Sequence, residues 1–333
     1  MVNVSKAMIM AAGVGSRLEP LTDGIPKPLV PIVNKPVMDI MFEKLASIGI
    51  EKVIANTHYL ADQIINRYKT NNFNIAFNYI FEENLSGTAG GLKKCQFFFE
   101  QGETFLVMSA DGLTDADIKR GIEIHNNSNA IATIGIKKID TEQIPNFGVV
   151  VTDKDGYIIE FQEKPSIDEA KSNFINTGIY IFDYKIFDYI PENTFYDFAK
   201  NVFPKLLEER AINTFEIEEY WSDIGTIEQY KQSTSDVLEG ECKIGSEILC
   251  NKISKTKLPD DICMGGYGTI GKNCKIGQNV TLINAIIWDD VEIGNDITIE
   301  NAVICNKAKI LCNIKDVIVP KNQIINEVVT NRT

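Results

Sequence analysis

The stretch AMIMAAGVGSRL, residues 7–18, decides the fold class of this 333-residue chain. The apolar run Ala7–Ala11 predicts a buried strand, and Gly13 and Gly15 predict a tight turn directly after it. Glycines at such a place let backbone N–H groups approach a polyphosphate, and Arg17 adds a cation that can contact two oxygens. The turn lacks the Gly-Lys-Ser/Thr ending of a Walker A and is not a complete Gly-x-Gly-x-x-Gly, so alone it is equally consistent with a structural turn.

A lysine between two prolines follows about ten residues later, in Pro26-Lys27-Pro28. Pro28 biases Lys27 toward an extended backbone, and Pro26 fixes the approach of the chain. An exposed loop lysine is the simpler interpretation of Lys27 alone. A rigidly presented lysine beside a glycine-rich turn, however, suits a phosphate clamp, so the two motifs together predict phosphate binding by Arg17 and Lys27.

Outward from this turn, apolar strands alternate with helical patterns as far as residue 232. Strands are expected over 7–11, 52–55, 75–81, 105–109 and 130–136, and helices over 36–48, 61–68, 88–99 and 115–126. Such alternation is typical of an α/β fold, here a Rossmann-like mixed, mainly parallel sheet with helices on both faces. Residues 147–182 contain strands with little helix between them, which predicts a sheet edge or a β layer that shapes a pocket.

From about residue 241 the apolar pattern changes to a period of six. Aliphatic residues recur at Ile270, Ile276, Leu282 and Ile293, with Trp288 on the same beat and one five-residue step. A hexapeptide period predicts a three-sided parallel β-helix, with aliphatic side chains inside and Asn and Gly at the corners. The predicted domains are therefore 1–235, an α/β domain, and 241–325, a β-helix. We expect a linker near 233–242 and a loop out of the coil over 250–269.

Composition narrows the classes of partner. The chain has 33 Lys and Arg against 46 Asp and Glu, a net charge of −13, which argues against a nucleic-acid-binding protein. No run approaches the roughly 20 apolar residues of a membrane span. The seven cysteines are scattered without a Cys-x-x-Cys pair, which favours reduced thiols and a cytoplasmic location.

A set of motifs now lies in a fixed order over residues 7–232: AAGVGSRL, IPKPLVPI, GTAGGL, SADG, FGVV, EKP, NTGIYIF and WSDIG. This set resembles the nucleotide-sugar pyrophosphorylases, or sugar-1-phosphate nucleotidylyltransferases, and most of all the mannose-1-phosphate guanylyltransferases. The six-residue repeat resembles the left-handed parallel β-helix that many members carry. The resemblance implies transfer of a nucleotidyl group from an NTP to a sugar-1-phosphate, with GTP and mannose-1-phosphate as the favoured pair.

The implied reaction makes physical sense of the charged residues. The attacking sugar-phosphate oxygen is already an anion at neutral pH, so the reaction needs no general base. The barrier is repulsion between two anions and the charge that develops on the leaving pyrophosphate, which positioning, Mg²⁺ and cationic side chains can lower. Two carboxylates suffice for Mg²⁺, because the ion keeps waters and takes its other ligands from phosphate.

By resemblance, Asp111 and Asp223 are the two Mg²⁺ ligands, and they act with Arg17 and Lys27 as the catalytic set. Asp111 follows an apolar strand at the end where open α/β sheets bind ligands. The alternative for each carboxylate is a loop or capping role, and Asp223 could cap the helix expected over 226–238.

The resemblance also assigns the substrate contacts. The nucleotide-binding residues are Ala12, Gly13, Gly15, Ser16, Glu82, Gly87 and Thr88. The sugar-phosphate-binding residues are Gly148, Glu163, Lys164 and Asn176. Thr88 could also cap the helix after it. The chain departs from the family pattern in having Ala12 for a glycine, Ser16 for a threonine and Ala110 before the metal-binding aspartate.

Three other features have simpler interpretations. Asp115 and Asp117 are expected to be first-turn helix charges, and His125 a charge at a helix C-terminus. Neither His58 nor His125 lies in the six-residue repeat, which argues against an acetylating site with a histidine base there.

Other functions remain open at this stage. A glucose-1-phosphate enzyme that uses another NTP is the alternative within the class. A non-catalytic regulatory subunit that binds an NDP-sugar, or a scaffold, is the alternative outside it. The presence of Arg17, Lys27, Asp111, Lys164 and Asp223 favours the enzyme. We expect a homo-oligomer assembled through the β-helix, because such coils have exposed flat faces and ends.

Overall fold

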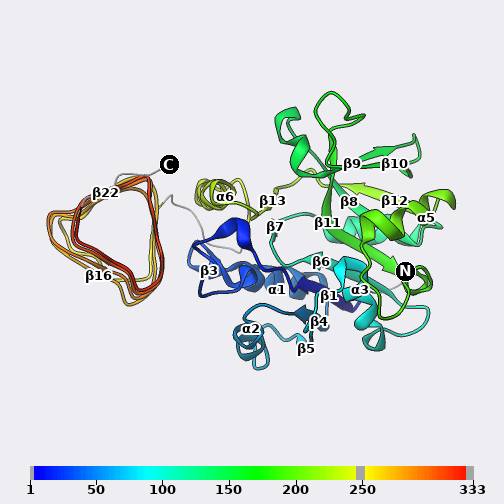
Figure 1. Cartoon of the computed structure of the whole chain (residues 1–333), viewed down its shortest axis with the longest axis horizontal. Helices are drawn as coiled ribbons and strands as arrows, with labels where there is room; N and C mark the ends of the chain where they lie inside the picture. The colour runs from blue at the N-terminus through cyan, green and yellow to red at the C-terminus, as the bar shows by residue number, and fades with distance from the viewer. Residues whose placement is uncertain (1–3, 245–251, 328–333) are drawn as a thin grey trace. The chain divides into compact units, whose positions relative to one another are not determined.

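The computed structural model describes residues 4–244 and 252–327 (Figure 1). Its contacts group the chain into two compact units. The first comprises Met1–Val14 and Met41–Asp223, and the second comprises Gly15–Ile40 and Ile224–Thr333. The segment with Arg17 and Lys27 therefore belongs to the same unit as the six-residue repeat. The domain division at residues 235–241 stays a prediction.

The first unit is built on a nine-stranded mixed sheet. Its longest path runs β10-β9-β11-β6-β1-β4-β5, and β8 pairs with β11 and β12. The strands are β1 Lys6–Ala11, β4 Lys52–Thr57, β5 Ala76–Phe81, β6 Thr104–Ser109, β8 Ala132–Lys138, β9 Gly148–Thr152, β10 Ile158–Glu163, β11 Phe174–Asp183 and β12 Ile212–Glu216. β1 pairs parallel with β4 and β6, whereas β11 runs antiparallel to β6 and β8. The predicted fold class is confirmed.

The expected helices are present, with shifts at their ends. They are α1 Val37–Ile48, α2 Ala61–Tyr68, α3 Gly87–Lys94 and α4 Ile118–Asn126. A further helix, α5 Phe203–Glu208, was not expected. The helix expected over 88–99 stops at Lys94, and Gln96–Phe98 forms a 3-10 turn. Asp117 is the N-cap of α4 and accepts from Arg120 N at 3.2 Å. Asp115 lies before the helix and accepts from Tyr220 N at 2.8 Å, so neither aspartate is a first-turn charge.

In the second unit, the short strands β2 Pro31–Ile32 and β3 Lys35–Pro36 form a hairpin, and α6 spans Ile227–Glu239. Thr226 caps α6 by accepting from Gln229 N at 3.3 Å, and Gly240 closes it at φ 89°. The linker expected near 233–242 is therefore helical as far as Glu239. Because Thr226 is the cap, the capping alternative for Asp223 is excluded.

The C-terminal part of the second unit is an all-parallel coil, as expected for a β-helix (Figure 1). Its strands are β14 Lys252–Ser254, β15 Cys263–Ile270, β16 Lys275–Ile276, β17 Thr281–Ile287, β18 Glu292–Ile293, β19 Thr298–Glu300, β20 Val303–Ile304, β21 Lys309–Ile310, β22 Ile314–Lys315, β23 Ile318–Val319 and β24 Ile324–Ile325. The prediction of a loop out of the coil over 250–269 is wrong, because β14 pairs with β15 and β15 with β17, which makes both strands part of the coil. Residues 250 and 251 lie outside the described part of the chain.

Hydrogen-bonded ladders at the corners fix the length of each turn. Asn284 Nδ2 donates to Asn301 Oδ1 at 2.9 Å, 17 residues on, and Asn301 Nδ2 to Asp316 Oδ1 at 3.0 Å, 15 residues on. All three residues have left-handed φ values, between 49° and 54°, which Asn and Asp tolerate better than most residues. The sequence spacing of two six-residue steps and one five-residue step is this 17-residue turn. Within the described residues, no helix is both long and apolar enough to cross a membrane.

Candidate active site

Two short strands bring the chain segments that carry the predicted metal ligands side by side. β7 Gly112–Thr114 and β13 Trp221–Asp223 pair antiparallel, and Asp223 lies opposite Gly112. Asp111 immediately precedes Gly112, so it is a near neighbour of Asp223 across this ribbon. Asp111 also follows the end of the central strand β6, the edge of an open α/β sheet at which ligands bind.

Trp221 connects this ribbon to the strand next to it. Its indole Nε1 donates to the carbonyl of Thr177 at 3.0 Å, and its ring meets that of Phe147 edge-on with centroids 5.7 Å apart. Because Trp221 and Asp223 share β13, these contacts fix the carboxylate relative to β11.

A bulge in β11 lies against the end of β6. The pairing of β11 with β8 shifts between Asn176 and Tyr180, and Gly178 within it has φ 75°. A Cβ on Gly178 would lie 2.8 Å from Ser109 Oγ, so only glycine permits this approach. The bulge therefore places Asn176 near the chain segment that carries Asp111.

The amide of Asn176 is held at both ends. Its Nδ2 donates to the Tyr180 hydroxyl at 2.9 Å, and its Oδ1 accepts from Gly178 N at 3.0 Å. Burial raises the pKa of the Tyr180 hydroxyl, and the carboxylates of Asp197, Glu163 and Asp111 raise it further, against the bond from Asn176. Predicted sugar and metal residues thus act electrostatically on one buried tyrosine.

The hairpin of β9 and β10 carries the other predicted sugar residues. Glu163 lies opposite Gly148, and Val149 pairs with Ile175, the neighbour of Asn176. The pairing therefore brings three of the four predicted sugar-phosphate residues together. The space that Gly148 leaves is filled by the Phe161 ring, since an added Cβ would lie 2.7 Å from it.

Lys164 directly follows this hairpin and has φ 48°. Its backbone N–H donates to the carbonyl of Phe147 at 3.2 Å, which continues the pairing of the two strands. A left-handed lysine costs on the order of 1 kcal/mol and persists only where its surroundings impose it, which is common at functional sites. Its role toward a sugar phosphate stays a prediction.

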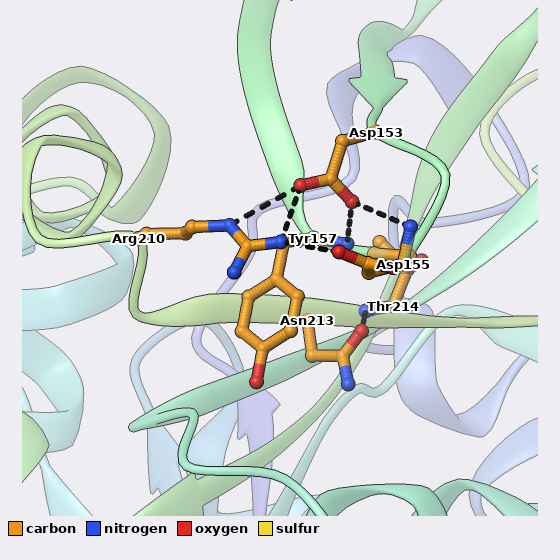
Figure 2. Close-up of polar contacts among 7 residues, drawn as sticks. Asp153, Asp155, Tyr157, Arg210, Asn213 and Thr214 are labelled. Carbon is orange, nitrogen blue, oxygen red and sulfur yellow. Dashed lines mark hydrogen bonds and ion pairs between the residues drawn. The ribbon is translucent and has the colours of Figure 1, made fainter.

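The far end of the same hairpin is fixed by a cluster of polar contacts, shown in Figure 2. Arg210 Nη2 donates to Asp153 at 2.7 Å and to Asp155 at 2.9 Å, and its guanidinium lies 4.4 Å from the centre of the Tyr157 ring. The bonds from Arg210 lower the pKa of the Asp153 carboxyl, and the backbone bonds from Tyr157 and Asp155 act in the same direction. The cluster joins the hairpin turn to the start of β12 through Tyr157 and Asn213.

The two phosphate motifs meet within the second unit. Gly15 has φ 77° and precedes the 3-10 turn Ser16–Leu18, which holds Arg17. A Cβ on Gly15 would lie 3.0 Å from the Cβ of Lys27, so glycine allows Lys27 to pack directly against the turn. The sequence prediction that these motifs belong together is consistent with this contact.

The local backbone at Lys27 differs from the expectation. Lys27 opens a 3-10 turn, Lys27–Leu29, whereas Pro26 is the extended residue at φ −69°, ψ 147°. The turn forms because Leu29 N donates to Pro26 O at 2.8 Å and Val30 N to Lys27 O at 3.1 Å. Alanine is tolerated at position 12, where the family pattern has glycine, because Ala12 is not among the described residues with positive φ.

The carboxylate of Glu82 is buried and hydrogen-bonded to other residues of the protein. The residue is 1% exposed, and its carboxylate accepts from Asn56 Nδ2 at 2.7 Å, from Ser86 N at 3.1 Å, from the Ser86 hydroxyl and from Lys94 Nζ at 3.0 Å. Burial opposes its ionisation, but the bonds from Ser86, Asn56 and Lys94 outweigh burial and lower the pKa of the carboxyl. Asn56 also accepts from Ala11 N at 3.1 Å, so Glu82 supports the end of β1 indirectly.

The start of α3 packs against a distant segment. Ala89 N and Gly90 N both donate to the carbonyl of Tyr196 at 3.0 Å, so this carbonyl caps the helix. Thr88 Oγ1 donates to Asp197 at 2.9 Å and accepts from Phe198 N, so Thr88 does not cap α3 as expected. Gly87, at φ 77°, leaves room for Tyr196.

Sequence reasoning missed several of the residues that position this site. Trp221 and Tyr180 lie within quoted motifs, two residues before Asp223 and four after Asn176. Their contacts across strands have no short-range signal. Asn56 follows an expected strand, and its pairing with Glu82 spans 26 residues. A polar residue at the end of a strand expected to be buried was the one available signal for Asn56.

Comparison with known proteins now decides the family. The profile described as nucleotidyl transferase matches residues 6–240. The chain belongs to the nucleotidyl transferase family. The match covers every predicted site residue, from Ala12 to Asp223.

Two relatives of this family member differ in their named substrates. A UTP–glucose-1-phosphate uridylyltransferase of Synechocystis is 36% identical over 327 residues, which cover 85% of this chain and 83% of that protein. A mannose-1-phosphate guanylyltransferase catalytic subunit beta of Drosophila pseudoobscura is 32% identical, covering 82% of this chain and 72% of that protein.

Solved structures agree on the fold. A putative glucose-1-phosphate thymidylyltransferase from Bacillus anthracis superposes with a TM-score of 0.63 at 25% identity, over 72% of this chain and 97% of that one. A UDP-glucose pyrophosphorylase, 21% identical with a TM-score of 0.63, covers 71% of this chain and 99% of the other and shows the same fold.

Proposed function

We propose that this nucleotidyl transferase joins an NTP to a sugar-1-phosphate, giving an NDP-sugar and pyrophosphate. The observation that supports the proposal is the pairing of β7 with β13, which sets Asp223 opposite Gly112, the residue after Asp111. A regulatory subunit that only binds an NDP-sugar would not need both carboxylates, so their presence supports the enzyme.

The chemistry balances without a proton acceptor. An oxygen of the sugar-1-phosphate attacks the α-phosphorus of the NTP, and the bond from that phosphorus to the β-phosphate oxygen breaks in line with it. Pyrophosphate leaves with the electron pair. In this scheme Arg17 and Lys27 reduce the charge repulsion on the NTP phosphates, and Lys164 holds the phosphate of the sugar.

Asp111 and Asp223 fit a magnesium ion. Within the described residues no three His, Cys, Asp or Glu side chains form a metal site by themselves. Two carboxylates completed by phosphate oxygens and waters are the usual way in which proteins hold Mg²⁺. When bound, the ion would offset phosphate charge and assist the departure of pyrophosphate.

Two substrate pairs deserve testing first. UTP with glucose-1-phosphate is favoured by the 36% identical relative, whose similarity extends over most of both chains. GTP with mannose-1-phosphate is favoured by the Glu82–Gly90 segment and by the guanylyltransferase relatives. Because the Glu82 carboxylate already accepts four bonds from the protein, from Asn56, from the backbone and hydroxyl of Ser86 and from Lys94, its use in reading guanine is weakened. We therefore place the UTP pair first.

The test is release of pyrophosphate across five NTPs and a panel of sugar-1-phosphates, with Mg²⁺ or with EDTA. We expect one pair to dominate, EDTA to abolish turnover, and Asp111→Asn to lower kcat at least 100-fold, the order of a lost charge-stabilising group. Asp62→Asn is the control, because Asp62 is exposed on α2. A folded chain that binds an NDP-sugar but turns over no pair would support the regulatory subunit instead.

A further inference from the structure

A buried hydrogen-bond relay runs from the coil to the Lys27 segment within the second unit. Trp288 follows strand β17, and its Nε1 donates to the Tyr230 hydroxyl at 2.8 Å. Tyr230, on α6, donates in turn to the carbonyl of Pro31 at 2.9 Å. Tyr230 is fully buried and Trp288 is 3% exposed, with the two rings edge-on at 6.4 Å. One hydroxyl therefore joins the coil, the helix and the β2–β3 hairpin.

Pro31 is close in sequence to the turn that presents Lys27. Val30, its neighbour, donates its N–H to Lys27 O and accepts from Val37 N, both at 3.1 Å. Pro31 pairs with Pro36 in the hairpin. Its carbonyl is thus fixed between the Lys27 turn and α1, so a shift of Pro31 would move Lys27.

The hairpin has a strained turn that needs external support. Val33 and Asn34, its two central residues, have φ 47° and 63°, as in a type I′ turn. A β-branched residue at positive φ is a genuine outlier, which persists only when surrounding contacts impose it. A second bond from the coil side does so, because Asn34 Nδ2 donates to the carbonyl of Ile270 at 3.0 Å.

We propose that the coil sets the position of the Lys27 turn through the β2–β3 hairpin, with Tyr230 and Asn34 as positioning residues for NTP binding. The inference rests on the proposed function, in which Lys27 meets the NTP phosphates. Tyr230 and Asn34 touch neither substrate and act through the backbone at Pro31 and at the hairpin turn. The coil is then part of the binding machinery as well as a structural appendage.

The test compares three full-length variants. Tyr230→Phe removes the shared hydroxyl with little loss of volume. Asn34→Gly removes the amide and tolerates the left-handed φ. Lys231→Gln is the matched control: Lys231 lies on the same helix, and its ammonium donates to the carbonyl of Asn301 in the coil at 3.1 Å.

We expect the dissociation constant of the Mg–NTP complex, measured by calorimetry, to rise three- to tenfold in Tyr230→Phe and in Asn34→Gly. The KM for the sugar-1-phosphate should change less than twofold, and Lys231→Gln should match the wild type in both. A general loss of stability would not weaken NTP binding while leaving the KM for the sugar-1-phosphate unchanged.

Other outcomes separate the two proposals. Unchanged NTP affinity in both variants, with only a lower Tm, would overturn the positioning role. If Tyr230→Phe does not fold, Asn34→Gly decides alone. A wild type that binds NTP but releases no pyrophosphate would refute the proposed function. The change in NTP affinity of the variants would still test the positioning role in that case. A wild type that binds no NTP would overturn both.

Discussion

His125 makes the stability of the first unit depend on pH. The residue is 5% exposed, and its Nδ1 lies 2.9 Å from Thr133 Oγ1 on β8. Burial lowers its pKa to about 4, although Asp183 acts in the opposite direction. The sequence-based prediction that His125 is a charge at a helix C-terminus is wrong, because a buried imidazole stays neutral at pH 7.

Acidification should therefore weaken the fold. Between pH 6.5 and about 4 the unfolded chain binds a proton at His125 that the folded chain does not, so stability falls as pH falls. We expect this residue to account for about 2 kcal/mol of unfolding free energy lost between pH 7 and pH 5. Urea unfolding of wild type and His125→Gln at both pH values checks it. Equal losses in the two proteins would contradict this origin.

At the level of single residues, the sequence predicted which side chains belong to the site better than it predicted which residues they bond. Asp111 and Asp223 were assigned together, and the β7–β13 pairing sets Asp223 opposite Gly112, the residue after Asp111; their joint role in binding a metal stays a prediction. Asp115 and Thr88 were assigned local helix roles, yet each bonds a segment about 105 residues away. Local propensity describes the cap that a residue can make, but not the distant chain that competes for it.

The β9–β10 hairpin shows how an element can be held at the end remote from a site. Its open end carries Gly148 and Glu163, and its turn is tied down by Arg210. Arg210 is itself at φ 49°, so its conformation is imposed by these contacts. The strands over 147–182 were expected from the sequence pattern, although their pairing as a hairpin was not. The tie from Arg210 to Asp153 spans 57 residues and has no periodic signal.

Loss of Arg210 should loosen the turn. In Arg210→Gln the ion pairs to Asp153 and Asp155 and the packing on Tyr157 are lost, so Lys154 in the turn becomes more accessible. We expect a Lys-specific protease to cut after Lys154 several times faster than in wild type, with fragments identified by mass spectrometry.

The matched control for this cut is Arg120→Gln, which removes a different exposed ion pair, to Glu218. Its rate of cleavage after Lys154 should equal that of the wild type. An Arg210→Gln turn that is cut no faster than the control would show that the polar cluster does not hold the hairpin.

For the molecule as a whole, the sequence correctly separated an α/β fold from a parallel coil. The first shows apolar strands that alternate with helical patterns, and the second shows an apolar repeat of six residues. Nothing in the sequence indicated that residues 15–40 group with the coil. That grouping depends on single bonds such as the one from Asn34 to the carbonyl of Ile270, whose partners lie 236 residues apart on elements of different kinds.

A homo-oligomer remains our proposal for the assembled protein. Ile324 and Leu311, in the last turns of the coil, are 62% and 46% exposed, and β24 pairs only with β21 among the described strands. Exposed aliphatic residues beside an open strand edge favour association. Sedimentation at micromolar concentration should give a mass of at least twice 37.2 kDa. A single 37 kDa species would count against the proposal.

The corner ladders also constrain how the length of this chain can change. Each Asn or Asp rung bonds a partner 17 residues on, or 15 in the last turn. An insertion of one residue within a strand of the coil would carry the aliphatic side chains that follow it in that strand off their inward positions and the next Asn off its corner. Gain or loss of a whole turn would keep both in place. The coil should therefore vary among descendants of this gene in steps of a full turn, while single-residue gaps accumulate in the loops of the sheet.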